Sequence, residues 1–516
     1  MRWRVFFILL CSTVVFVGPV LWSARNLTFR LDSDYDTVLP ILHFIVDSFH
    51  TTKIIPLWNP YIGTGVSIIG DPLSLVLNPF ILLPIMVFGA EQGLRITIFL
   101  VVFFSGLSMW FFLTKLDVAG WLRLWGATLY QTSGALGARL AAGQIQTFLS
   151  YPLIPLFFAT TLSARMKKIN IFSAAFVLTL IIFSGDFYTV LFLSIFFLGI
   201  KGYHVIAKQE HWTRALFELF VVYFLFGIFA SVKLVPYIFE VLPHTERFSI
   251  INPFAGSIPI FFSLLPFVIP FRTVFYDRPF FQRLFGFHFN WYEYYVFISP
   301  LPFLFLLKIK ELRKHNITVL LIFLICVGAL YGSLKFLYSP FYWLFHLVPT
   351  IRMFRVPQRI FTPMVPLLIG LLTLCAQKWK GRIAIIICSL SIVWTFFVGQ
   401  QTMLLSFEQP RIKEATLVHT LRQKDKSSFF VITFSCCMQT FLIDEHIPIL
   451  NYYYGWKLKG TPNFVAKNGE SDFSSLYIIR PKYIIAPNAM NFSSYSYEKL
   501  FGDSISTVWY TRLVTL

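Results

Sequence analysis

Long apolar runs separated by short polar or basic loops make up most of the first 400 residues. Each run is close to the length that an α-helix needs to cross about 30 Å of hydrocarbon. The pattern predicts about eleven transmembrane helices. Their expected ranges are residues 5–22, 74–89, 94–113, 145–162, 171–184, 187–200, 216–236, 292–307, 317–334, 360–376 and 383–398.

Three shorter apolar stretches do not fit this pattern. They cover residues 122–138, 258–271 and 341–349, and they contain Gly or Pro. Because these residues interrupt helices, we expect re-entrant or interfacial segments here and no full crossing.

The pattern changes after about residue 402. Polar residues return, and short strand-like runs at residues 429–433, 483–486 and 505–510 alternate with helical pieces such as residues 412–421. The sequence therefore predicts an all-α polytopic membrane domain at residues 1–402 and a small α/β domain at residues 403–516. A segment of this length can hold a core of its own.

Composition supports a membrane protein. The chain is 57% hydrophobic and 13% charged, with a mean hydropathy of +0.70. A soluble domain carries roughly 25% charged residues, so an ordinary cytosolic enzyme is excluded. The net charge of +19 resides largely in short loops between apolar runs, which favours contact with lipid headgroups and not with nucleic acid.

Basic loops predict which side each loop faces, because Lys and Arg accumulate on the cytoplasmic side. We assign the N-terminus and four loops to the cytoplasm. These loops contain Arg165, Lys167 and Lys168; Lys201, Lys208 and Arg214; Lys308, Lys310, Arg313 and Lys314; and Lys378, Lys380 and Arg382. The chain is then a multi-pass protein of the plasma or inner membrane, whose first outer loop (about residues 25–73) and C-terminal domain are extracytoplasmic.

The first outer loop carries three alternating acids, Asp32, Asp34 and Asp36. A carboxylate at the membrane surface can act as a general base. An EF-hand is excluded, because Thr37 and His43 occupy the positions of its Gly and Glu. No pattern requires a cofactor, although a divalent cation bound by these acids and a merely solvated acidic loop stay open as alternatives.

Arginines also gather on the predicted outer side, where positive charge is scarce. Arg352, Arg355 and Arg359 lie within eight residues, and Arg139 lies in a weakly apolar segment shortly before Gln144. Arginine binds phosphate in a bidentate manner, so these residues are candidates for a lipid-phosphate site. Contact with anionic headgroups is the alternative for the triplet, and extension to the membrane surface is the alternative for Arg139.

These motifs occur in an order that resembles the bacterial YfhO-type membrane proteins, relatives of the GT-C glycosyltransferases. The resemblance covers most of the chain, and two motifs are its most specific parts. They are Pro56-Leu-Trp-Asn-Pro60, which contains Trp58 and Asn59, and Phe354-Arg-Val-Pro-Gln-Arg359. Relatives often carry His where this chain has Gln144, and an amide cannot act as a base.

The resemblance implies a membrane glycosyltransferase. Such an enzyme moves a sugar from a polyprenyl-phosphate donor to a glycan, lipid or protein acceptor of the cell envelope. Asp34 or Asp32 is then the base, and Arg355, Arg359, Arg352 and Arg139 contact the phosphate. The expected lining residues are Asp36, Gln144, Glu246, Arg247, Glu293, Trp58 and Asn59. A flippase and a non-catalytic assembly factor for lipid-linked glycans are the alternatives.

Overall fold

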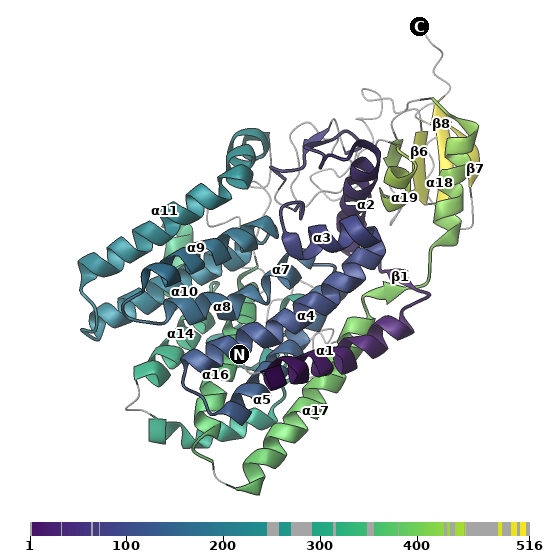
Figure 1. The fold of residues 1–516 in the computed structure, drawn as a ribbon. Helices are drawn as coiled ribbons and strands as arrows, with labels where there is room; N and C mark the ends of the chain where they lie inside the picture. Colours follow the sequence, from purple (N-terminus) through teal and green to yellow (C-terminus); the bar gives the residue numbers. More distant parts are fainter. Residues whose placement is uncertain are drawn as a thin grey trace.

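The structure is a computed structural model of the 516-residue chain. It describes residues 3–31, 33–62, 65–71, 73–244, 257–269, 291–312, 316–347, 356–379, 381–427, 431–433, 439–447, 449, 483–487, 497–502 and 506–511. A body of long helices carries a small sheet and a group of loops at one end (Figure 1).

Within the described residues, six helical segments are long and apolar enough to cross a membrane. They comprise α1 (Trp3–Ser23), α4 (Ala90–Lys115), α10 (Phe187–Ile206), α11 (Trp212–Pro236) with its π-helical extension η1 (Tyr237–Val241), η8 (Pro357–Ile360) with α16 (Phe361–Ala376), and α17 (Arg382–Leu404). Three shorter apolar helices accompany them: α3 (Pro79–Phe88), α9 (Lys168–Phe183) and α14 (Asn316–Gly332). By length and composition the chain is an integral membrane protein, whereas the count of about eleven spans stays a prediction.

Two predicted spans are not continuous α-helices. The range 145–162 forms α7 (Ile145–Ser150) and α8 (Leu153–Thr161), with Pro152 between them. In the range 292–307, residues 294–300 are non-helical and are followed by the 3-10 helix η6 (Leu301–Leu312), and both Pro300 and Pro302 lie at this junction. Proline removes a backbone donor and disfavours helix in the residue before it, which explains both differences.

The predicted re-entrant stretches form short helices. Residues 122–138 fall in α5 (Gly120–Gln131) and α6 (Gly134–Ala141), which are buried against α17 and α4. The described parts of the other two contain η4 (Ile260–Phe262) with α12 (Leu265–Val268), and α15 (Pro340–Leu347).

The first predicted outer loop folds into a helix and small strands. It contains β1 (Thr28–Phe29), α2 (Tyr35–Thr52), β2 (Trp58–Asn59) and β3 (Val66–Ser67), and β2 pairs antiparallel with β3. Lys233 of α11 donates a hydrogen bond of 2.6 Å to the carbonyl of Ser74, just after this loop. The loop is therefore fastened to the helical body.

The C-terminal part contains the remaining strands. After β4 (Phe407–Glu408) come α18 (Ile412–Lys424), β5 (Val431–Thr433), α19 (Gln439–Asp444), β6 (Tyr483–Pro487), β7 (Tyr497–Gly502) and β8 (Ser506–Thr511). The sheet order is β5-β6-β8-β7, in which β5 and β6 are parallel and the other pairs are antiparallel. Strands thus form where strand-like runs were expected, while the boundary at residue 403 and the extracytoplasmic location stay predictions.

The first loop and the C-terminal part are packed together. Strand β1 pairs antiparallel with β4, and the amide of Leu31 donates to the Glu408 carboxylate at 2.9 Å. On the other side of the loop, α2 packs against α19, where His43 Nδ1 lies 3.0 Å from Asp444 Oδ1. Figure 1 shows α2, α19 and the sheet at the same end of the molecule.

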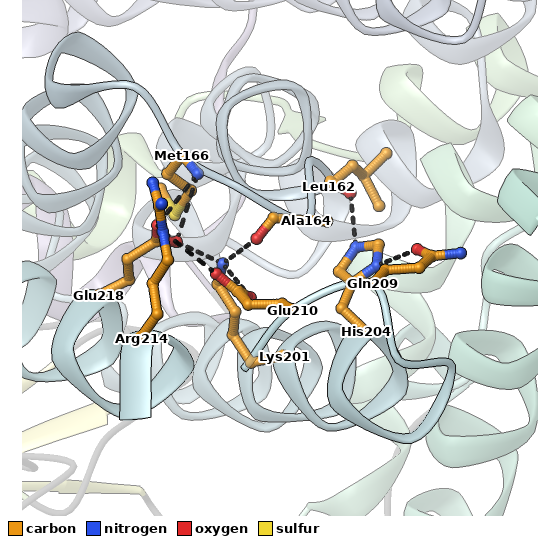
Figure 2. A network of polar contacts seen from close by, with 9 residues as sticks. All are labelled: Leu162, Ala164, Met166, Lys201, His204, Gln209, Glu210, Arg214 and Glu218. Carbon is orange, nitrogen blue, oxygen red and sulfur yellow. Dashed lines mark hydrogen bonds and ion pairs between the residues drawn. The ribbon is translucent and has the colours of Figure 1, made fainter. Parts of the chain in front are cut away.

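A buried ion network lies near the C-terminal end of α10, where the chain turns into α11 (Figure 2). Lys201 Nζ contacts the carboxylates of Glu210 and Glu218 and donates to the carbonyl of Ala164, and Arg214 Nε contacts Glu218 at 3.1 Å. Lys201 was expected in an exposed basic loop, but its side chain is 1% exposed. The two carboxylates balance the charges of Lys201 and Arg214, so the network leaves no net charge for a ligand. Its contacts hold the turn between α10 and α11 against the segment that precedes α9.

Other basic residues of this end remain at the surface. Arg165, Lys167, Lys168 and Lys208 are exposed beside the buried network. This positive surface agrees with the cytoplasmic assignment of this end.

Candidate active site

The turn after α6 is the centre of the candidate site. The helix ends at Ala141, Ala142 caps it, and Gly143 adopts a left-handed backbone conformation with a φ of +72°. The amide of Gln144 then donates back to the carbonyl of Arg139 at 2.9 Å. This tight turn directs the side chains of Arg139 and Gln144 to the same acceptor, Glu293.

Glu293 joins two arginines that are 220 residues apart in the sequence. Arg359 binds its carboxylate in a bidentate manner, through Nε at 2.8 Å and Nη2 at 2.6 Å. Arg139 Nη1 donates to Glu293 Oε2 at 3.1 Å, and Gln144 Nε2 donates to Oε1 at 2.8 Å. Both carboxylate oxygens therefore accept two hydrogen bonds each.

Arg139 is enclosed by these contacts. Its side chain is fully buried, and it also donates to the Gln144 side chain at 2.8 Å and to Thr362 Oγ1 at 3.1 Å. A ligand therefore has little access to the Arg139 guanidinium. Its contacts hold Glu293 in position.

Arg359 is more accessible than Arg139. Its side chain is 19% exposed, and its guanidinium lies 4.6 Å from the ring centroid of Tyr188. Nε and Nη2 are occupied by Glu293, while Nη1 makes no hydrogen bond within the described part of the chain. The Glu293 and Tyr188 contacts orient the guanidinium and leave one nitrogen available to an anion.

Asp34 lies on the other side of the same turn. Its backbone amide donates to the carbonyl of Ala142 at 3.1 Å, and the Tyr35 hydroxyl donates to the carbonyl of Leu140 at 2.8 Å. The exposed Asp34 side chain does not cap α2, and its charge acts on Arg359. A carboxylate from the first loop and a cation from the α16 region therefore meet at one site.

The contacts of the two arginines keep Glu293 ionised. Burial alone would raise the pKa of Glu293, but Arg359 and Arg139, with the Gln144 hydrogen bond, outweigh it and lower this pKa to about 2. Glu293 is therefore ionised at neutral pH. The charges of Asp34 and Asp186 also act on Arg359 and Arg139 respectively, so the two arginines carry no surplus of positive charge.

We expect Gly143→Ala to disturb the site. A Cβ atom there would lie 2.5 Å from the amide nitrogen of Tyr35 and 2.9 Å from the carbonyl carbon of Asp34, and the φ of +72° disfavours any residue with a side chain. Since Asp34 would be displaced, a catalytic rate that depends on it should fall about 10- to 100-fold. The rate of sugar transfer by purified protein measures this.

Gly89→Ala is the matched control. Gly89 has a similar φ of +78°, but an added Cβ would meet nothing within 4 Å. Equal activity in the two variants would contradict the docking of Asp34 on this turn.

The structure thus brings together several of the predicted residues and separates others. Asp34, Arg139, Gln144, Glu293 and Arg359 converge, and Asp36 is half-buried in the first turn of α2. Trp58 and Asn59 lie apart in β2, where the Trp58 ring covers Gly65 and Asn59 accepts a hydrogen bond from the amide of Tyr61. The remaining candidates, Asp32, Glu246, Arg247, Arg352 and Arg355, lie outside the described residues.

Two contributors were missed by the sequence analysis, namely Thr362 and Tyr188. Thr362 follows Arg359 by three residues, so helical spacing places both on one face. Tyr188 lies in the polar break between two apolar runs, next to Asp186, whose charge acts on Arg139. Helical spacing from a candidate arginine was therefore a usable signal.

Side chains that could hold a metal ion are not clustered in the described part of the chain. Within it no group of three or more His, Cys, Asp or Glu side chains is arranged to hold a metal ion. Asp32, the first of the three acids of the first loop, lies outside the described residues.

Comparison with known proteins gives a structural result only. No family model and no curated protein sequence matches the chain. Arabinofuranosyltransferase AftD from Mycobacteria superposes with a TM-score of 0.52 at 11% identity, over 98% of this chain and 40% of AftD. The chain thus spans less than half the length of that enzyme.

Two further structures have similar folds. The Archaeoglobus fulgidus oligosaccharyltransferase gives a TM-score of 0.50 at 12% identity, over 94% of this chain and 69% of that one. ArnT from Cupriavidus metallidurans gives 0.50 at 10% identity, over 98% and 97%. The chain therefore has a fold similar to that of GT-C-type membrane glycosyltransferases, as predicted.

Proposed function

We propose that the protein is a membrane glycosyltransferase of the YfhO type. It would move a sugar from a polyprenyl-phosphate donor to an acceptor of the cell envelope on the extracytoplasmic side. The observation that carries this proposal is the turn at residues 142–144. It contacts the backbone of Asp34 on one side and, through Gln144, the Glu293 carboxylate that holds both arginines.

The proposed reaction is a single displacement. Asp34, with Asp32 as the alternative, accepts the proton of an acceptor hydroxyl while its oxygen attacks the anomeric carbon of the sugar. The bond between this carbon and the phosphate oxygen breaks, and its electron pair leaves with the polyprenyl phosphate. One displacement without a covalent enzyme intermediate inverts the anomeric centre.

Arg359 would stabilise the leaving phosphate. Its Nη1 is the available donor of the cluster, and a fixed cation stabilises charge that develops in the transition state. Arg352 and Arg355 are proposed as further phosphate contacts on sequence grounds. Arg139 would act through Glu293 by holding the carboxylate that orients Arg359.

The membrane setting is consistent with a lipid-linked donor. A polyprenyl tail and the six candidate membrane helices share the bilayer, so the donor would approach laterally. The C-terminal sheet lies at the same end of the molecule as α2 and would position the acceptor (Figure 1).

An assay of the wild-type protein tests the reaction class. Purified protein in detergent is incubated with polyprenyl-phosphate-linked sugars and envelope acceptors, and mass spectrometry follows polyprenyl phosphate and glycosylated product. We expect both products to appear together. Intact donor after incubation, combined with movement of the same lipid across proteoliposomes, would instead identify a flippase.

A further inference from the structure

A pocket lies between α1 and α4, at the end of these helices that is nearest β1. Its volume is about 400 Å³, within the range of small-ligand sites. It is lined by Leu21, Arg25, Gln92, Arg95, Ile96 and Phe99. An apolar wall thus meets two arginines and an amide.

The pocket opens between two candidate membrane helices. The rings of Phe6 and Phe103 are in contact with centroids 5.1 Å apart, so α1 and α4 are packed closely toward the other end. Near the pocket, Trp22 is 71% exposed at the end of α1. Exposed Trp at a helix end is typical of the membrane–water interface, so the pocket lies where a lipid headgroup meets its tail.

Arg95 is fixed in place but its charge is not balanced by an ion pair. It is 7% exposed and donates through Nη1 to Ala24 at 3.0 Å and through Nη2 to Leu27 at 2.6 Å. Its buried Nε has no hydrogen-bond partner, and across the described ranges no carboxylate lies within 4 Å of it. Glu91, one turn earlier, offsets only part of this charge from a distance.

Arg25 contributes a second cation at the rim. Its side chain is exposed and lies 4.6 Å from the ring centroid of Trp22. In the part of the chain that the structure describes, it forms no ion pair either. Two arginines beside an apolar pocket are complementary to a phosphate attached to a hydrocarbon tail.

We propose that this pocket binds one anionic phospholipid of the surrounding membrane, with its phosphate at the exposed Arg25, the buried charge of Arg95 behind it and an acyl chain along Ile96 and Phe99. The site is separate from the Glu293 cluster and does not depend on the proposed transferase activity. A zwitterionic lipid has no net charge to match the two arginines, so the site selects anionic headgroups.

Native mass spectrometry of the full chain in detergent tests this site. The protein is titrated with phosphatidylglycerol and, separately, with phosphatidylcholine. We expect the first phosphatidylglycerol to bind about tenfold more tightly than phosphatidylcholine. Equal affinity of the wild-type protein for the two lipids would overturn the proposal.

Arg25→Gln is the main variant, because an exposed side chain can be replaced without loss of folding. We expect it to lose most of the preference for phosphatidylglycerol. Arg382→Gln removes the same charge from an exposed position at the start of α17 and should keep the preference. Retained preference in Arg25→Gln, or equal losses in both variants, would show that the pocket is not the site.

Ile96→Trp tests the apolar part of the pocket independently. The larger side chain fills the space for the acyl chain, so both lipids should bind several-fold more weakly while the arginines are intact. Native affinity for both lipids in this variant would also contradict the proposal.

Discussion

Asp34→Asn is expected to reduce sugar transfer about 100- to 10,000-fold, the usual contribution of a general base. Asparagine has nearly the same shape as aspartate, but its amide cannot accept the acceptor's proton. The backbone contact of residue 34 with Ala142 should persist, because it involves only main-chain atoms. The rate is measured by the release of polyprenyl phosphate from a lipid-linked sugar at saturating acceptor.

Asp47→Asn is the matched control for this prediction. Asp47 is exposed on the same helix, α2, and the substitution removes the same charge. Its rate should be close to that of the wild-type protein. Asp32→Asn tests the alternative base, and native rates in both the Asp32 and Asp34 variants would show that neither residue is the base.

Glu293→Gln is expected to destabilise the protein by about 3–5 kcal/mol, because it leaves the buried Arg139 and the partly buried Arg359 without their carboxylate. The Glu293 side chain is 6% exposed, and both of its oxygens accept hydrogen bonds from arginine. The orientation of Arg359 should be lost with it, so transfer should fall as well. Thermal unfolding of the purified protein in detergent measures the loss of stability.

Glu408→Gln provides the comparison. Glu408 also pairs with one arginine through two nitrogens, Arg411 Nε at 2.7 Å and Nη2 at 3.1 Å, but this pair is partly exposed. A pair of this kind contributes roughly 0–1 kcal/mol. Similar unfolding midpoints for the Glu293 and Glu408 variants would contradict the predicted contribution of Glu293 to stability.

The stability that the Glu293 carboxylate contributes should decrease at low pH. The folded protein lowers the pKa of Glu293 from 4.5 to about 2, so its carboxylate contributes stability at pH values above 4.5. This contribution decreases as the pH falls from 4.5 toward 2. The difference between wild-type and Glu293→Gln protein should therefore be constant between about pH 6 and 8.

The membrane helices were largely predictable from the sequence, because a crossing segment must be long and apolar. Helices such as α4 and α17 lie close to their expected ranges. The failures at residues 145–162 and 292–307 have a common cause. Pro152, Pro300 and Pro302 lie where the expected helices are interrupted, and a hydropathy criterion does not register the backbone donors that they remove.

The candidate site was predictable as a list of residues but not as an arrangement. Arg139, Glu293 and Arg359 each stood out as charges near apolar segments. Their joint contact depends on tertiary packing of η5 (Trp291–Glu293) against α6, which no local pattern reveals. Spacing also could not show that Arg139 is enclosed while Arg359 has an available nitrogen.

Lys201 shows the same limit for the basic loops. The sequence placed it correctly at the end of an apolar run, beside other basic residues. Its pairing with Glu210 and Glu218 depends on how the α10–α11 turn closes, as Figure 2 shows. Charge counts therefore do not show which of the basic residues are exposed.

A structure of the protein with polyprenyl phosphate bound tests the central claim most directly. Helix α10 connects the two polar clusters, with Tyr188 at one end and Lys201 about 20 Å along its axis. The account predicts the phosphate within hydrogen-bonding distance of Arg359 Nη1, facing Asp34. A phosphate bound at the Lys201 end would contradict it.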